Sequence, residues 1–284
     1  MLFGTAGWDY ADWAGIVYPP GRGVDRLRAT ARFVDLLEVN ATFYTVPGHR
    51  TVSSWLERGR DAGVRFSIKA PRRLTHEEHE PLDRELATLF RERIVPLQDA
   101  GLLVAVLLQF PHRFHHERAS AARVARLVEL LEGLPLVVEF RHRSWLTDRV
   151  LSWCERHRVA FCNIDQPSFP GTLPPTAIRT APLGYVRLHG RNRATWFARL
   201  DDRDRRYDYL YTDEDLRGWA ERIRRIADGA EEVAVVANNH FRAQALAAIV
   251  RLRLLLGERD VPIPVPLLEV DPGLADLPVR PVPP

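Results

Sequence analysis

The chain has 284 residues, 46% hydrophobic and 27% charged, which is enough to bury a large core in one big domain or two small ones. The formal net charge of +3 gives little support for a nucleic-acid partner. No segment approaches the roughly 20 uninterrupted apolar residues that span a bilayer, and the first residues lack a signal-peptide pattern. We therefore expect a cytoplasmic protein without a membrane partner.

Short aliphatic or β-branched runs alternate along the chain with segments of helical periodicity. The predicted strands are Leu2–Thr5, Asp35–Val39, Val64–Ile68, Leu102–Leu108, Leu136–Phe140, Val159–Ile164, Tyr185–Leu188 and Val233–Ala237. The predicted helices are Val24–Phe33, Val52–Arg60, Asp83–Leu97, Glu117–Leu131, Asp148–His157, Asp213–Ala227 and Phe241–Leu256. Strands alternating with helices over about 250 residues indicate an α/β protein, a TIM-like (β/α)8 barrel forming a single domain over 1–257.

Two segments depart from this alternation. QPSFPGTLPPTAIRTAP, residues 166–182, replaces the helix expected between the sixth and seventh strands. Residues 258–284 form a Pro-rich tail whose VPIPVP stretch cannot be helical, so we expect an extended or disordered end.

An open doubly wound sheet is the alternative fold. No GxGxxG or GxxxxGK[ST] loop follows a predicted strand, so we expect no nucleotide cofactor.

The chain contains 39 arginines but one lysine, Lys69, and only five asparagines. Lys69 falls at the C-terminal end of the third predicted strand, where barrel enzymes place their active sites. Four of the asparagines also fall at the ends of predicted strands, namely Asn40, Asn163, Asn238 and Asn239. Residues that escape a strong preference for arginine are informative, and these gather at the predicted barrel mouth.

Polar side chains at these strand ends are spaced two residues apart, which places both members of a pair on one face of a strand. The pairs are Glu38 with Asn40, Ser67 with Lys69, Glu139 with Arg141, Asn163 with Asp165, and Arg187 with His189. We expect this face to line the barrel mouth, with Gln109 adding an amide. Buried charges are costly unless they are paired or used. A purely structural pairing of Glu139 with Arg141 or Arg187 is the alternative.

Seven motifs identify a family resemblance. In order and spacing, GTAGWDYADWAGIVYPP, EVNATFY, FSIKAPRRLTH, LLQFPHRF, VEFRHRSW, YVRLHGR and the NNH at 238–240 resemble the YecE-like family (domain of unknown function 72), from about Phe3 to Leu256. The resemblance implies a TIM-barrel-like fold and no established reaction. His240 replaces the acidic or small residue of the family pattern, and the tail after Gly257 has no recognised counterpart.

The predicted site carries more positive than negative charge, so we expect a small anionic substrate, a phosphate or carboxylate held by arginines. The predicted catalytic residues are Lys69, Glu139, Asp165 and His189. The predicted substrate-binding residues are Trp8, Glu38, Asn40, Arg72, Gln109, Arg141, Arg187, Asn238 and Asn239. Guanidinium neighbours lower the pKa of a lysine, so Lys69 can be a Schiff-base nucleophile, a general acid or a phosphate ligand.

Three functional hypotheses stay open. The first is an enzyme acting on an anionic substrate, with phosphoester hydrolysis slightly favoured over Schiff-base lyase chemistry. The second is a metal-dependent isomerase or nuclease-like barrel that uses Glu38, Glu139, Asp165 and His189 as ligands, although the neighbouring cations oppose a metal ion. The third is a non-catalytic protein that binds a small anion, or binds nucleic acid through the arginine- and tyrosine-rich loop 191–211. The sequence does not indicate an oligomeric state.

Overall fold

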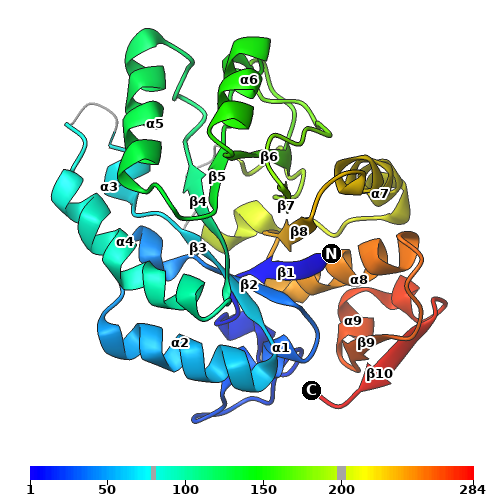
Figure 1. The fold of residues 1–284 in the computed structure, drawn as a ribbon. Coiled ribbons are helices and arrows are strands. Elements are labelled where there is room, and N and C mark those ends of the chain that lie inside the picture. The colour runs from blue at the N-terminus through cyan, green and yellow to red at the C-terminus, as the bar shows by residue number, and fades with distance from the viewer. Residues whose placement is uncertain (78–80, 197–202) are drawn as a thin grey trace.

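The structure is a computed structural model that describes residues 1–77, 81–196 and 203–284. Its parallel strands form a closed barrel in chain order (Figure 1). Strand β1 pairs with β2 and also with β8, which closes the sheet. The predicted barrel is thereby confirmed and the open doubly wound sheet excluded. The barrel strands are β1 (Leu2–Ala6), β2 (Leu36–Val39), β3 (Arg65–Lys69), β4 (Leu103–Gln109), β5 (Leu136–Glu139), β6 (Ala160–Asp165), β7 (Leu183–Leu188) and β8 (Glu232–Ala237).

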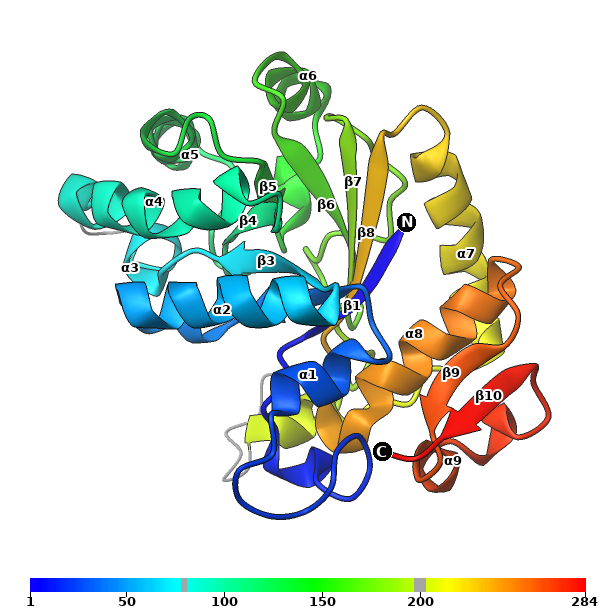
Figure 2. The same ribbon diagram turned by 60° about the horizontal axis from the view of Figure 1, so that its bottom comes forward.

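Helices cover the outside of the barrel (Figure 2). They are α1 (Arg26–Ala31), α2 (His49–Ala62), α3 (Arg72–Thr75), α4 (Arg84–Asp99), α5 (Arg118–Leu130), α6 (Asp148–Arg156), α7 (Asp213–Ala227), α8 (Gln244–Leu255) and α9 (Leu267–Val270). Residues 166–182 run without a helix, as predicted, because proline removes backbone donors and restricts the residue before it. None of the helices in the described part of the chain is long and apolar enough to cross a membrane.

Local sequence sets the ends of several helices. The backbone N–H of Asp215 donates to the Thr212 hydroxyl, and the Thr212 N–H donates to the Asp215 carboxylate, so a capping box starts α7. The predicted helix from Phe241 is shortened. Arg242 and Ala243 have φ angles of 46° and 60°, so a 3₁₀ turn, η5 (Phe241–Ala243), precedes α8. This left-handed backbone shapes the loop that follows β8.

The C-terminal residues are ordered against α8 rather than left free. Strands β9 (Val261–Pro264) and β10 (Val279–Val282) pair in parallel, beside α8 and α9 in both ribbon views (Figures 1 and 2). Leu267 and Leu274 are fully buried there. Arg251 of α8 forms an ion pair with Asp271, with 2.6 Å between Nε and Oδ2. The VPIPVP stretch is extended, as expected, but apolar burial and this ion pair anchor the segment.

Candidate functional site at the barrel mouth

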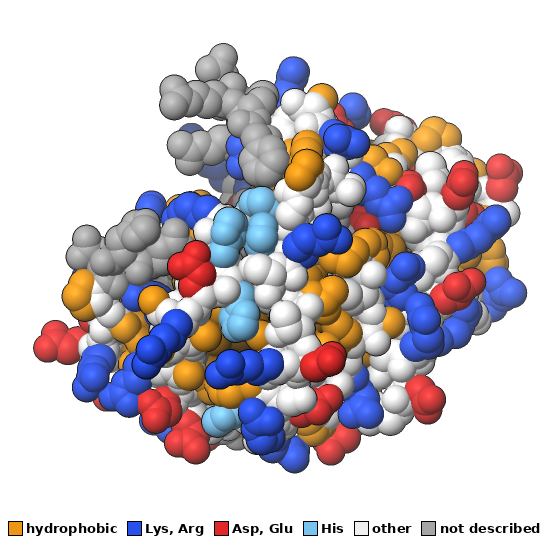
Figure 3. Space-filling view, turned by 90° about the horizontal axis from the view of Figure 1, so that it is seen from above, with side chains coloured by type: hydrophobic (Ala, Val, Ile, Leu, Met, Phe, Trp, Pro, Cys, Tyr) orange, Lys and Arg blue, Asp and Glu red, His pale blue; other side chains and the backbone are white. Residues whose placement is uncertain are grey.

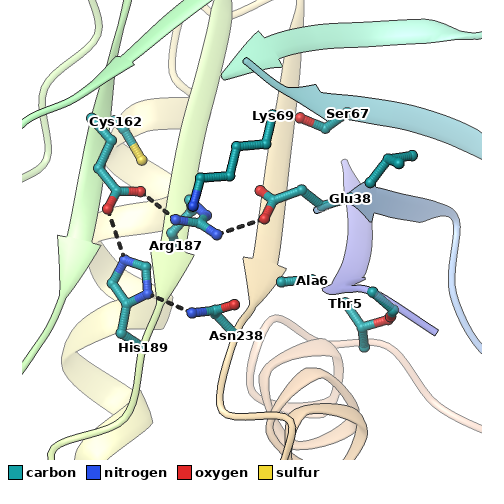
Figure 4. Close-up of polar contacts among 12 residues, drawn as sticks. Thr5, Ala6, Glu38, Ser67, Lys69, Cys162, Arg187, His189 and Asn238 are labelled. Carbon is teal, nitrogen blue, oxygen red and sulfur yellow. Dashed lines mark hydrogen bonds and ion pairs between the residues drawn. The ribbon is translucent and has the colours of Figure 1, made fainter. Parts of the chain in front are cut away.

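A buried ion-pair network lies under the mouth of the barrel. Arg187 of β7 donates from Nη2 to Glu38 of β2 and from Nη1 to Glu139 of β5, each at 2.5 Å. All three side chains are almost completely buried, and Figure 4 shows Arg187 reaching toward Glu38 across the barrel. Burial alone would raise the pKa of Glu139, but Arg187 and Arg141 outweigh it and hold that pKa well below its usual range. Glu139 is therefore a carboxylate whose charge is balanced by arginines.

His189, the residue that directly follows β7, extends this network. Its Nδ1 lies 3.0 Å from the amide nitrogen of Asn238, and its Nε2 lies 3.2 Å from Glu139 Oε1. Because the Asn238 amide is a donor, Nδ1 accepts and the Nε2 proton points to Glu139. Burial, reinforced by Arg141, lowers the pKa of His189 to about 3. His189 is thus a neutral connecting group with both ring nitrogens in use.

Lys69 stands apart from these pairs. Its ammonium nitrogen lies 4.1 Å from the centre of the Phe43 ring, on the 3₁₀ turn η2 (Ala41–Phe43). Within the described residues, no carboxylate lies within ion-pair distance of this nitrogen. Burial, followed by the charge of Arg187, lowers the pKa of Lys69 to about 7. A large fraction of Lys69 is therefore the free amine near neutral pH.

A cavity of about 630 Å³ opens above the network. The sequence-predicted residues that line it are Asn40, Lys69, Gln109, Arg141, Arg187 and Asn238. The Oδ1 atom of Asn40 is buried and has no hydrogen-bond partner among residues 1–77, 81–196 and 203–284, which leaves an acceptor for a bound group. A cavity of similar size, about 650 Å³, lies between α5 and α6 near Trp153, away from these residues. The mouth cavity is therefore our candidate site.

Seven other cavity residues were not predicted from the sequence, namely Tyr10, Phe43, Tyr44, His76, Arg206, Tyr207 and His240. The rings of Tyr10 and His240 stack 4.2 Å apart at 7°. His76 packs edge-on against Phe43, and burial together with the charge of Lys69 lowers the pKa of His76 to about 3. Five of the seven, Tyr10, Phe43, Tyr44, His76 and His240, belong to motifs that the sequence analysis singled out, so the aromatic content of those motifs was the missed signal.

Asp165 does not face the mouth, and the prediction that it does is wrong. Its carboxylate accepts from the indole nitrogen of Trp219 in α7 at 3.0 Å and from Arg191 Nε at 2.9 Å. The Tyr211 hydroxyl also donates to it. In the register of β6 with β7, the inward-facing Arg187 pairs with Ile164, whereas Asp165 pairs with Leu188, so Asp165 lies on the outward face of β6 between barrel and helices.

The side chain of Asn163 lies on the same outward face of β6 as that of Asp165. Its side-chain amide donates to the Ile178 carbonyl at 2.8 Å and its oxygen accepts from the Ile178 N–H at 2.7 Å. It therefore braces the helix-free segment after β6 rather than the mouth. The inward face of β6 carries Cys162 instead, a buried free thiol whose pKa is raised by burial and then by Glu139.

Four predicted substrate-binding residues lie outside the cavity lining, and one of them, Glu38, belongs to the buried network below it. Arg72 is exposed and pairs with Glu77 at 3.4 Å. The side chain of Asn239 donates to the Tyr209 carbonyl at 2.9 Å and so holds the loop before α7. Trp8 is half-buried and packs against the hydrophobic core. Arg72, Asn239 and Trp8 support the rim.

Histidines gather beside the mouth, on the loops after β4 and β5. The rings of His115 and His142 stack with centroids 3.9 Å apart, and His112 meets His142 edge-on at 5.1 Å. Figure 3 shows histidine side chains grouped on the face that it draws. Within the described residues, no group of three or more His, Cys, Asp or Glu side chains is placed to hold a metal ion.

Loop 191–211 is the segment for which the sequence analysis raised the hypothesis of nucleic-acid binding. Residues 197–202 lie outside the described part of the chain. Of the described part, Arg191 pairs with Asp165 and with Asp215, whose oxygen lies 2.8 Å from Nη1. This arginine therefore holds the loop to the barrel and to α7.

The fold and site define a (β/α)8-barrel protein with a cationic pocket at the C-terminal ends of its strands. Residues 2–269 match the family described as protein of unknown function DUF72, and the chain belongs to this family. The match extends past Gly257 into the tail, to which the sequence analysis had assigned no counterpart.

Relatives support the family at both sequence and structure level. The UPF0759 protein YunF of Bacillus subtilis is 26% identical over 259 residues, covering 86% of this chain and 90% of that protein. The crystal structure of a DUF72 family protein from Thermotoga maritima has 30% identity and a TM-score of 0.78, covering 90% of this chain and 99% of the other. D-psicose 3-epimerase from Clostridium cellulolyticum, at 15% identity and a TM-score of 0.54 over 90% of this chain and 99% of the other, shares the fold alone.

Proposed function

We propose that the barrel mouth is an active site for a small anionic carbonyl compound, and that Lys69 forms an imine with it. The observation that carries this proposal is the environment of Lys69 and the pKa that results from it. It has no carboxylate partner among the described residues, it rests against Phe43, and its pKa of about 7 leaves free amine at neutral pH. An unprotonated amine is the form that attacks a carbonyl carbon.

The chemistry needs little besides the amine and a place for negative charge. The amine adds to the carbonyl carbon and yields a carbinolamine, which takes up one proton and loses water to give a protonated imine. That cation withdraws electrons from the neighbouring carbon, and so permits cleavage or rearrangement of a carbon–carbon bond next to it. Arg141 lines the same cavity and is only partly buried, so its guanidinium is available to bind a carboxylate or phosphate.

Phosphoester hydrolysis, the preference drawn from the sequence, has weaker support because its proposed bases are occupied. Glu139 accepts from two arginines and lies next to His189. His189 uses both ring nitrogens, and Asp165 points away from the cavity. A metal-dependent reaction has similar difficulty, since Glu38 and Glu139 are already bound to guanidinium groups where a cation would have to sit.

Reductive trapping tests the proposal. The protein is incubated with pyruvate or glyceraldehyde 3-phosphate and borohydride, and the adduct is located by peptide mass spectrometry. Lys69 carries the only ε-amine in the chain, so any lysine adduct identifies it. We expect a saturable adduct on Lys69 that added phosphate suppresses and that Lys69→Arg lacks. If Lys69 reacts no faster than in the urea-unfolded chain, the imine proposal is wrong.

A further inference from the structure

A second chamber opens from the side of the mouth cavity. It has a volume of about 460 Å³ and shares five lining residues with the first cavity, namely His76, Gln109, Arg141, Arg206 and Tyr207. Its additional walls come from the loop after β4, with His112 and Arg113, and from Trp196. The shared residues place the two cavities next to each other. A ligand with one end in each cavity would pass along these shared side chains.

The charge lining this lateral chamber is positive. Arg113, Arg141 and Arg206 contribute to its wall, and no acidic side chain does so within the described part of the chain. Arg113 is anchored, because its Nη2 donates to the His76 carbonyl at 2.8 Å. A guanidinium has five N–H donors in a planar fork, so an anchored arginine still presents donors to an anion. The chamber is therefore suited to a group with several negatively charged oxygens.

Trp196 gives the chamber an apolar wall that carries one hydrogen-bond donor, the indole N–H. The side chain is 8% exposed, and the guanidinium carbon of Arg141 lies 5.5 Å from the centre of its ring. Its indole N–H makes no hydrogen bond to any residue that the structure describes. An indole donates but cannot accept, so this group also favours an acceptor-rich ligand. The ring face can cover a short carbon chain between two polar ends.

We propose that the lateral chamber is a phosphate subsite, so that the ligand is a phosphorylated carbonyl compound with its phosphate held by Arg113 and Arg206. The carbonyl end then lies at Lys69, an assignment that rests on the proposed function. A phosphate monoester offers the charge and the acceptor oxygens that bidentate arginine contacts require. The ligand class is thus a sugar phosphate or a similar phosphorylated aldehyde or ketone.

The test compares matched ligands with and without phosphate. Calorimetry measures binding of glyceraldehyde 3-phosphate, erythrose 4-phosphate and ribose 5-phosphate against glyceraldehyde, erythrose and ribose. For at least one chain length, we expect the phosphate to tighten binding about tenfold or more. The double variant Arg113→Gln/Arg206→Gln should lose this preference. The control Arg60→Gln/Arg259→Gln removes the same charge from exposed positions outside the lateral chamber and should keep it.

Lys69→Arg separates the two proposals. This variant keeps the positive charge but cannot form an imine, so we expect it to retain the phosphate preference in binding while losing reductive trapping. Trapping absent from the wild type would overturn the imine proposal, and the binding data would still judge the subsite. Equal binding of phosphorylated and unphosphorylated sugars by the wild type, or a preference that survives in Arg113→Gln/Arg206→Gln, would overturn the subsite.

Discussion

The Lys69 ammonium nitrogen lies 4.1 Å from the centre of the Phe43 ring, whereas buried charged side chains are usually paired with an opposite charge. An aromatic face attracts a cation, but more weakly than a carboxylate does once solvent is removed. The ring therefore does not offset the burial and the arginine charges that lower the pKa of Lys69 to about 7. Arginine stays protonated under such conditions, which gives a physical reason for a lysine at this position.

The first prediction concerns the titration of Lys69. Because the chain has one lysine, isotope-labelled lysine gives a single ε-methylene NMR signal without further assignment. We expect its titration midpoint near pH 7, more than two pH units below that of an exposed lysine. Arg141→Gln should raise the midpoint by removing a nearby positive charge, whereas Arg60→Gln on the surface of α2 should not. A midpoint near 10 in the wild type would contradict this account.

The second prediction links that titration to stability. Between about pH 7 and the ordinary lysine pKa of about 10.4, the unfolded chain binds more protons at Lys69 than the folded chain. The free energy of unfolding contributed by Lys69 therefore rises with pH across this window, and its destabilising effect is largest below pH 7. Urea denaturation of the wild type and Lys69→Met at several pH values measures it. We expect Lys69→Met to increase the free energy of unfolding, relative to wild type, most at pH 6.5 and least at pH 10. A difference independent of pH would contradict the shifted pKa.

The third prediction concerns the arginine network. Glu139→Gln leaves Arg187 and Arg141 buried with one carboxylate fewer, so we expect it to lower the free energy of unfolding by about 3–5 kcal/mol. Glu232→Gln is the control. It breaks the Arg65–Glu232 pair, in which both side chains are about one-third exposed, and should cost about 1 kcal/mol or less. Equal losses in urea denaturation would show that the buried network contributes no more than a surface pair.

The sequence predicted the barrel well because its strands are apolar runs separated by helical periods, and both periods are local properties. The mouth was predicted less completely. Residues spaced two apart share a strand face, but which face points inward depends on the twist and stagger of the closed barrel. Glu139 of β5 and Arg141, two residues after it, face in, whereas Asn163 and Asp165 of β6 face out. Loop aromatics such as Phe43 and Tyr10 reach the cavity through backbone turns that no periodicity records.

The fourth prediction distinguishes the two faces of β6. Asp165 receives hydrogen bonds from Trp219, Arg191 and Tyr211 outside the barrel interior, so Asp165→Asn should destabilise the fold by about 2–3 kcal/mol. At a temperature where the variant stays folded, its reductive trapping on Lys69 and its binding of sugar phosphates should match the wild type. Circular dichroism, urea denaturation and the trapping assay measure these effects together. A folded Asp165→Asn protein that no longer traps its ligand would restore Asp165 to the catalytic role that the sequence suggested, and would mean that the outward network controls the mouth.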